Sequence, residues 1–369
     1  MIFTVDWKNG GSMLTKVASI LVTTCALSLA GDWSPKAAAD YLDARQKAWF
    51  AWPTAQKGPE GPCLSCHTGL TYLLARPALG QALGENEPTS YESGMLQAIR
   101  KRVPQDTSEK FAPRSKEPKA SESLGSEAVM SALLLASDDA RHGGLTKETE
   151  QAFDRLWAVQ LTSGKNKGAW SWNSFDLDPW EEPDSMFYGA ALAALAVGVA
   201  PSGYQSRPNI QANVGALKAY LAAHQQSQPA HNRLLLVWAS TKLRGIMTDT
   251  ERKRIVTDVL HSQQPDGGWT IASIGPWKEH TNAPAASGSN SYATGLVAFV
   301  LQQAGIPRSN PSMNRALEWL RAHQDKDGSW DAQSMNKKYD AGSMPLEFMR
   351  DAATSFASLA LLESNNSTR

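Results

Sequence analysis

Gln264-Pro265-Asp266-Gly267-Gly268-Trp269 is the stretch that decides the fold. It recurs as Gln324-Asp325-Lys326-Asp327-Gly328-Ser329-Trp330, and a looser version places Gln160 ahead of Gly168-Ala169-Trp170. We call these three stretches the Gln–Gly–Trp boxes. Glycine permits the left-handed turn that ends a helix. The Trp ring can pack over that helix, and the Gln amide can bond loop backbone. The boxes therefore predict a helix end that repeats along the chain.

Helical periodicity recurs in pairs between and around the boxes. The first helix of each pair is amphipathic and charged, whereas the second is apolar almost all round, as expected of a buried inner helix. The predicted pairs are 35–52 with 65–83, 91–102 with 122–135, 146–160 with 185–199, 210–225 with 231–243, 248–263 with 291–304, and 311–323 with 351–362. Six such hairpins predict an all-α fold, an (α/α)6 toroid with an inner and an outer ring. An open solenoid is the alternative, although neither end carries a polar capping repeat.

The boxes and paired helices resemble the terpenoid cyclase and protein prenyltransferase toroid superfamily, whose repeats end in a Gln…Asp-Gly-x-Trp box. The resemblance covers most of residues 35–365, with clear boxes in the third, fifth and sixth repeats. It implies the toroid fold but carries over no catalytic residues. The Asp-x-Asp-Asp acid motif of squalene-type cyclases is absent from the sequence, and the later repeats hold no cysteine for a prenyltransferase zinc site.

A second motif, Cys63-Leu64-Ser65-Cys66-His67, is typical of covalent attachment of a c-type haem. Each cysteine sulfur can add to one vinyl group of the porphyrin, and His67 then lies beneath the iron as the proximal ligand. A zinc site is the alternative, but it needs about four ligands and the sequence has no second CxxC pair. A redox dithiol or a local disulfide would leave His67 without a role. We therefore predict haem c as the cofactor.

The first thirty residues have the pattern of a secretory signal peptide. Lys16 precedes the small, apolar run 17–30, which is too short to span a bilayer and ends in the cleavage-type sequence Ser28-Leu29-Ala30. Met13 is an alternative start, and an uncleaved anchor is the alternative reading. The prediction is a signal peptide at 1–30, followed by a single toroid domain at 31–369 without a stable membrane span.

Export agrees with the haem motif, because bacterial c-type haem is attached outside the cytoplasm. The expected location is therefore periplasmic or otherwise exported. Residues 37–42 and 73–79, together with the haem motif, resemble a group of exported bacterial proteins that join CxxCH to squalene-cyclase-type repeats. The chain has 36 Lys and Arg against 36 Asp and Glu. This balance gives no reason to expect nucleic acid or an anionic membrane surface as a partner.

Chemistry can gather where the six inner helices begin, because in a ring these starts meet at one mouth. The candidate residues there, besides His67, are Glu127, Asp184, Tyr188, His231, Tyr292 and Asp351. Each of them is also explained as a capping or solvent-exposed residue. Asp184 and Asp351 in particular lie where a first-turn acid stabilises the helix dipole. The acidic loop 176–184 is predicted to be solvated.

The distal iron ligand decides between the redox roles, and spacing does not choose among the candidates. These are Met95, Met130, Met186, His142, His231 and His280. The predicted function is redox, either electron transfer with a partner protein or a haem-dependent reaction on a small apolar molecule in the central cavity. One alternative is an isoprenoid cyclase-like enzyme that uses cavity carboxylates. Another is a toroid that binds a ligand or peptide without catalysis. These alternatives leave open whether the protein is an enzyme.

Overall fold

The structure, a computed structural model, describes residues 33–56, 60–104 and 118–366. The predicted signal peptide lies outside these residues. The described residues belong to one compact unit. Their regular elements are helices, and their extended pairing is limited to isolated bridges at 56 with 62 and 177 with 181. None of these helices is long and apolar enough to cross a membrane.

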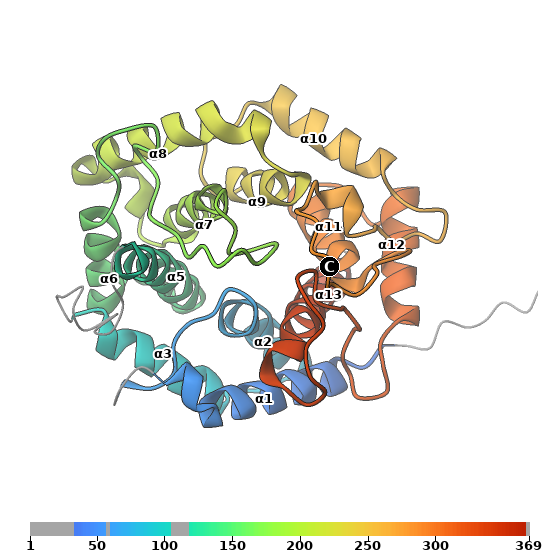
Figure 1. Cartoon of the computed structure of the whole chain (residues 1–369). Coiled ribbons are helices and arrows are strands. Elements are labelled where there is room, and N and C mark those ends of the chain that lie inside the picture. Colours follow the sequence, from blue (N-terminus) through green and yellow to red (C-terminus); the bar gives the residue numbers. More distant parts are fainter. Residues whose placement is uncertain (1–32, 57–59, 105–117, 367–369) are drawn as a thin grey trace, which may run out of the picture. The chain divides into compact units, whose positions relative to one another are not determined.

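Two concentric rings of helices make up the unit (Figure 1). The outer ring consists of α1 (Pro35–Ala51), α3 (Ser90–Arg102), α6 (Lys147–Ala158), α8 (Gln211–His224), α10 (Asp249–His261) and α12 (Pro311–Ala322). The inner ring consists of α2 (Gly69–Leu83), α5 (Lys119–His142), α7 (Met186–Val199), α9 (Ala230–Ser240), α11 (Ser291–Gln303) and α13 (Phe348–Asn366). Each inner helix contacts the next, and α13 contacts α2, so the ring is closed. The predicted (α/α)6 toroid is confirmed, and the solenoid alternative is wrong.

Some helix bounds differ from the prediction for local reasons. Helix α2 begins at Gly69 instead of Ser65, because the Ser65 hydroxyl accepts hydrogen bonds from the backbone N–H groups of Thr68 and Gly69 at 3.2 and 2.9 Å. A serine that satisfies the first free N–H groups stands before a helix, not inside it. The haem motif therefore precedes α2 in a turn. Helix α13 begins three residues earlier than predicted, at Phe348.

The tryptophans of the three boxes tie each loop to the helix before it. Their indole Nε1 groups donate to backbone carbonyls near the ends of α6, α10 and α12 at 2.7, 2.8 and 2.8 Å; the pairs are Trp170 with Leu156, Trp269 with Val259, and Trp330 with Leu320. All three rings are fully buried. The predicted packing of Trp over the preceding helix is confirmed.

The glycines of the boxes allow close contact with the next outer helix. Gly168, Gly267 and Gly328 have φ values of 98°, 99° and 90°, which L side chains rarely adopt. A Cβ atom at Gly328 would lie 2.1 Å from the carbonyl oxygen of Ala37, near the start of α1. Only glycine lets the backbones meet there.

The glutamines of the boxes join successive outer helices. Each Nε2 donates both to its own loop and to the start of the next outer helix: Gln160 to Gly168 and Asn213, Gln263 to Gly267 and Ser312, and Gln324 to Gly328 and Ser34. In the fifth repeat this residue is Gln263, and the assignment of the role to Gln264 is wrong by one position. Because Ser34 caps α1, the sixth box closes the outer ring between α12 and α1.

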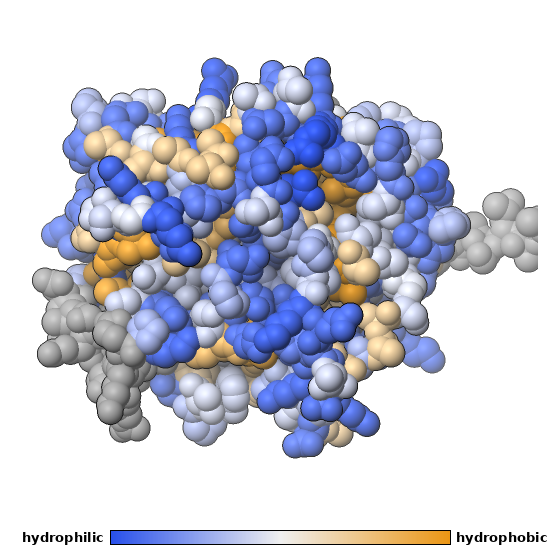
Figure 2. Space-filling view, turned by 45° about the horizontal axis from the view of Figure 1, so that its top comes forward, coloured by the Kyte–Doolittle hydropathy of each residue, from blue (hydrophilic) through white to orange (hydrophobic). Residues whose placement is uncertain are grey.

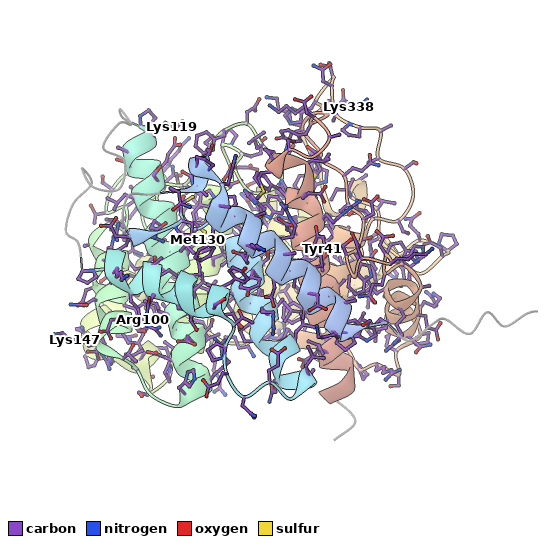
Figure 3. All side chains as sticks on the ribbon, turned by 90° about the horizontal axis from the view of Figure 1, so that it is seen from below. Tyr41, Arg100, Lys119, Met130, Lys147 and Lys338 are labelled. Carbon is purple, nitrogen blue, oxygen red and sulfur yellow. The ribbon has the colours of Figure 1, made fainter. Side chains whose placement is uncertain are left out.

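The surface is mostly hydrophilic on the face that Figure 2 presents, with hydrophobic residues visible in gaps between the polar ones. The long loops between paired helices extend over the mouth where the inner helices begin. Lys119, at the start of α5, and Lys338, in the loop before α13, mark this end of the molecule, whereas Arg100 and Lys147 lie at the other (Figure 3).

Candidate functional site

The haem motif lies at the mouth end, in the turn between α1 and α2. Cys63 is fixed through its backbone, because its N–H donates to Ala55 at 2.7 Å and its carbonyl accepts from the Trp49 indole at 3.0 Å. Cys66 is buried, and its Sγ lies 3.9 Å from the Sδ of Met130 on α5. Neither cysteine is in a disulfide. Burial raises the pKa of the Cys66 thiol, whereas a redox dithiol needs a lowered one.

His67 is the first member of a hydrogen-bonded relay that reaches the last inner helix. Its Nδ1 lies 2.9 Å from the Thr68 hydroxyl, and this hydroxyl lies 2.8 Å from Asp351 Oδ2 on α13. Asp351 also accepts from Arg45 Nε at 2.7 Å and from the Tyr41 hydroxyl at 3.1 Å, both on α1.

The relay determines which nitrogen of His67 carries the proton. Asp351 is paired with the Arg45 guanidinium, so its carboxylate accepts hydrogen bonds. The Thr68 hydroxyl therefore uses its only O–H to donate a hydrogen bond to Asp351. The Thr68 oxygen is then left to accept from His67, which places the proton on Nδ1. The Nε2 of His67 keeps its lone pair. This is the tautomer that a metal ion bound through Nε2 requires.

Aromatic side chains enclose the His67 ring. Phe348 stacks on it with ring centroids 3.6 Å apart, and Trp49 and Trp180 approach at 5.8 and 5.9 Å. Burial, with a smaller contribution from Arg45, lowers the pKa of His67 to about 3. The imidazole is therefore neutral at physiological pH.

A cavity of about 210 Å³ opens beside the motif. Its lining includes Cys63, His67, Arg102, Met130, Phe175 and Glu181. The Arg102 guanidinium pairs with Glu127 at 2.8 Å and donates to the Pro62 carbonyl at 3.0 Å, but its Nη2 is buried without a hydrogen-bond partner. Burial raises the pKa of Glu181 to about 7. The cavity thus combines one guanidinium N–H group that lacks an acceptor, on Arg102 Nη2, with a carboxyl group whose pKa is near neutrality.

These residues fit a haem better than a zinc ion. A metal site of this kind needs at least three His, Cys, Asp or Glu ligand atoms close together. Within the described part of the chain, one such group has its atoms within 4.8 Å of one another, and it consists of Asp178, Glu182 and His280. The atoms of Cys63, Cys66 and His67 are therefore too far apart for one zinc shell. A c-type haem would need the two thiols at its edge and the histidine at its iron, and its propionates would need hydrogen-bond donors such as the Arg102 Nη2. The cavity is smaller than a porphyrin, so attachment would require the side chains that line it to move apart.

Three of the predicted candidates meet at the centre of the ring. His231 Nε2 lies 2.8 Å from the Tyr292 hydroxyl, which also accepts from Trp180 Nε1 at 3.1 Å. Tyr188 stacks on His231 at 5.7 Å. Burial lowers the pKa of His231 to about 4. These side chains are almost fully buried and pack as a continuous aromatic cluster through Trp180 to His67.

The three acidic candidates lie apart from this cluster. Glu127 pairs with Arg102 beside the motif, Asp351 is the acceptor at the end of the His67 relay, and Asp184 is exposed at the start of α7. The predicted solvated character of the acidic loop is wrong for Asp178 and Glu182, which are buried.

Of the six distal-ligand candidates, Met130 is the one that lines the cavity with Cys63 and His67. Figure 3 shows it well along α5 from Lys119. His142 ends the same helix, about 18 Å farther on at 1.5 Å per residue. The other candidates lie elsewhere: Met95 in the core on α3, Met186 at the start of α7, His231 with both nitrogens hydrogen-bonded, and His280 beside Asp178.

Several residues of the site have no signature in the sequence. Arg45 and Asp351 are separated by 306 positions, and only ring closure brings them together. Phe348 lies at the start of α13 and Trp180 lies in the loop before α7, and both contact His67 from far along the chain. The one local signal is Thr68, a hydroxyl directly after the motif histidine.

Comparison with known proteins supports the fold. Residues 233–369 match the family model described as squalene-hopene cyclase C-terminal domain. No curated protein matches the chain in sequence. A glycosidase variant in complex with glucose aligns with a TM-score of 0.51 at 13% identity, over 90% of this chain and 98% of that chain. Another glycosidase variant aligns with a TM-score of 0.51 at 11% identity, over the same shares of the two chains. At such identities the likeness concerns the fold alone. The chain is therefore an α/α toroid whose last repeats are similar to the squalene-hopene cyclase C-terminal domain.

Proposed function

We propose that the chain carries a c-type haem bonded to Cys63 and Cys66, with His67 Nε2 as the proximal ligand, and that it serves in electron transfer. Each thiol adds across one vinyl C=C bond, so that sulfur takes the inner carbon and hydrogen the outer one, without an oxidant. When bound, a histidine-ligated haem supplies a one-electron couple. The proposal includes export, in keeping with the signal predicted at 1–30.

The observation that carries the proposal is the relay from His67 to Asp351. A histidine that ligates a metal almost always donates its other ring N–H to a carboxylate, a backbone carbonyl or water, and this contact fixes the ring and raises its basicity. Here the Thr68 hydroxyl oxygen accepts a hydrogen bond from that N–H at 2.9 Å, and its own O–H donates to Asp351 at 2.8 Å.

The other residues of the cavity suit the same group. Arg102 offers a buried N–H without an acceptor, which a propionate would satisfy. Met130 presents a thioether on the same cavity wall. Glu181, with its pKa raised to about 7, can take up or release a proton as the charge beside it changes.

The packed centre of the ring supports electron transfer over a reaction in a central cavity. Trp180, Tyr292, His231 and Tyr188 fill the region between the inner helices and are at most 5% exposed. Cyclase chemistry, one of the alternatives, needs an available acid. Two of its three candidates, Glu127 and Asp351, are instead neutralised by arginines.

Production of the chain with and without a cytochrome c maturation system tests the proposal. We expect haem stain to stay on the chain in a denaturing gel after maturation, and a pyridine haemochrome spectrum typical of two thioether bonds. C66S should shift that spectrum to one thioether, and C63S/C66S should lose the stain. M130L changes the same cavity without removing an attachment point, and it should keep the stain.

The result that would overturn the proposal is matured, folded protein without colour, in which both thiols react with a thiol reagent after unfolding. Circular dichroism of C63S/C66S shows whether the helices survive without attachment. If they do, loss of stain reports on the bonds to haem and not on misfolding.

A further inference from the structure

A second cluster of metal-binding side chains lies in the loops at the mouth, outside the haem motif. Asp178 and Glu182 come from the loop before α7, and His280 comes from the loop before α11. One ligand atom from each lies within 4.8 Å of the other two. His280 Nε2 is 3.5 Å from Asp178 Oδ2.

Asp178 and Glu182 are buried, the His280 side chain is 13% exposed, and two polar atoms of the cluster lack a hydrogen-bond partner. Asp178 is 4% exposed and Glu182 is 9% exposed. Glu182 Oε1 and His280 Nε2 are both buried atoms without a hydrogen-bond partner. A buried carboxylate oxygen without a hydrogen bond is destabilising, so such atoms normally contact a partner.

Nearby cations do not compensate this charge. The Lys278 ammonium lies in the same region, but it pairs with Asp176, an exposed residue of the same acidic loop. The backbone N–H of Lys278 makes a long contact of 3.3 Å to Asp178 Oδ2. A cavity of about 190 Å³ adjoins Asp178 and Glu182 and also meets Asp184 and Asn232.

We propose that Asp178, Glu182 and His280 bind a divalent transition-metal ion. Two carboxylates and one imidazole form a mixed oxygen and nitrogen set, which suits zinc or manganese better than the all-oxygen preference of calcium or magnesium. Glu182 Oε1 and His280 Nε2 provide lone pairs that nothing else uses. The adjoining cavity leaves room for water as a further ligand.

The ion would hold two loops together above the haem motif. Asn336, from the loop before α13, already bonds the Asp178 backbone in both directions, at 2.8 and 2.9 Å. Trp180, two residues after Asp178, contacts His67 and donates to Tyr292. A metal at Asp178 therefore fixes the segment that positions Trp180 over His67. The site does not depend on haem attachment.

Zn²⁺ titration of the chelator-treated, full-length protein by calorimetry tests the site, with bound metal counted by elemental analysis. We expect one Zn²⁺ per chain and a higher thermal midpoint with the ion. E182Q and H280A should each weaken binding more than about tenfold. D176N is the matched control, because it removes an exposed acid from the same loop, and it should bind as the wild type does.

C63S/C66S separates this site from the haem motif, and it should keep its Zn²⁺. The proposal is overturned if the wild type binds no Zn²⁺, a result that needs no variant to fold. It is also overturned if E182Q and H280A bind as tightly as D176N. Loss of the ion in C63S/C66S alone would place zinc at the motif, which contradicts both this site and the haem proposal.

Discussion

Thr68→Val tests the relay that orients His67. Valine keeps the shape of threonine but removes the hydroxyl that lies 2.9 Å from His67 Nδ1 and 2.8 Å from Asp351 Oδ2. A hydrogen bond to a charged acceptor contributes about 1.5–3 kcal/mol, and a buried N–H left without an acceptor costs about 1–3 kcal/mol. Asp351 still accepts from Arg45 and Tyr41. We therefore expect a loss of about 3 kcal/mol in the free energy of unfolding.

Thr68→Ser is the control, since it keeps the hydroxyl and loses one methyl group, at a cost of about 1 kcal/mol. Urea unfolding followed by circular dichroism should therefore separate the two variants by about 2 kcal/mol. Asp351→Asn breaks the same relay from its other end, so T68V/D351N should cost less than the sum of the two single changes. In the haem-loaded protein, T68V should raise the reduction potential, because the proximal ligand becomes less basic. Equal stability of T68V and T68S would refute the role of the Thr68 hydroxyl in the relay between His67 and Asp351.

Two further predictions concern the joints and the cavity. Gln263→Ala removes a hydrogen bond to Gly267 in its own loop and two bonds to α12, with Ser312 and Arg315. Gln264→Ala removes a single side-chain bond to Ser262, so Q263A should be less stable by about 1 kcal/mol in urea unfolding. Equal losses of stability in Q263A and Q264A would contradict the role of Gln263 in joining α10 to α12. The pKa of Glu181 is raised to about 7 from its ordinary value of 4.5, so the folded chain holds a proton that the unfolded chain releases. Glu181 therefore contributes stability that is lost as pH rises from about 4.5 to 7, whereas His67 and His231, with lowered pKa values, contribute in the opposite direction. Glu181→Gln should remove this contribution, so the difference in stability between the variant and the wild type should change by about 2 kcal/mol across the window. Glu182, whose pKa is also raised to about 7, is unchanged in this variant. Urea midpoints measured at pH 5–8 that parallel the wild type would contradict the assignment.

The helices were accessible from the sequence because the pattern that predicts them is local. Apolar residues with helical spacing define each segment, and the boxes mark where three of the outer helices end. The finer assignments depended on register. Gln263 and Gln264 are equivalent in sequence, and only the position of α12 decides which of the two amides reaches Ser312.

The site was less accessible because it depends on contacts across the ring. The motif itself names Cys63, Cys66 and His67, but Asp351 looked like an ordinary first-turn acid. It lies in the first turn of α13, as predicted, yet its carboxylate is buried against residues from α1 and the motif. The acidic loop likewise gave no sign that Asp178 and Glu182 fold inward, since their partner His280 comes from two repeats later.

The joint between Gln324 and Ser34 also affects how the protein is made. Helix α1 leaves the ribosome before the other helices, whereas Gln324, which bonds Ser34 at the start of α1, is among the last residues to emerge. Until then α1 lacks its contacts with α13 and its bond to Gln324. Chaperones would encounter this incomplete ring for most of translation. A circular permutant with its new ends between two earlier hairpins would move the point of closure without changing the finished ring.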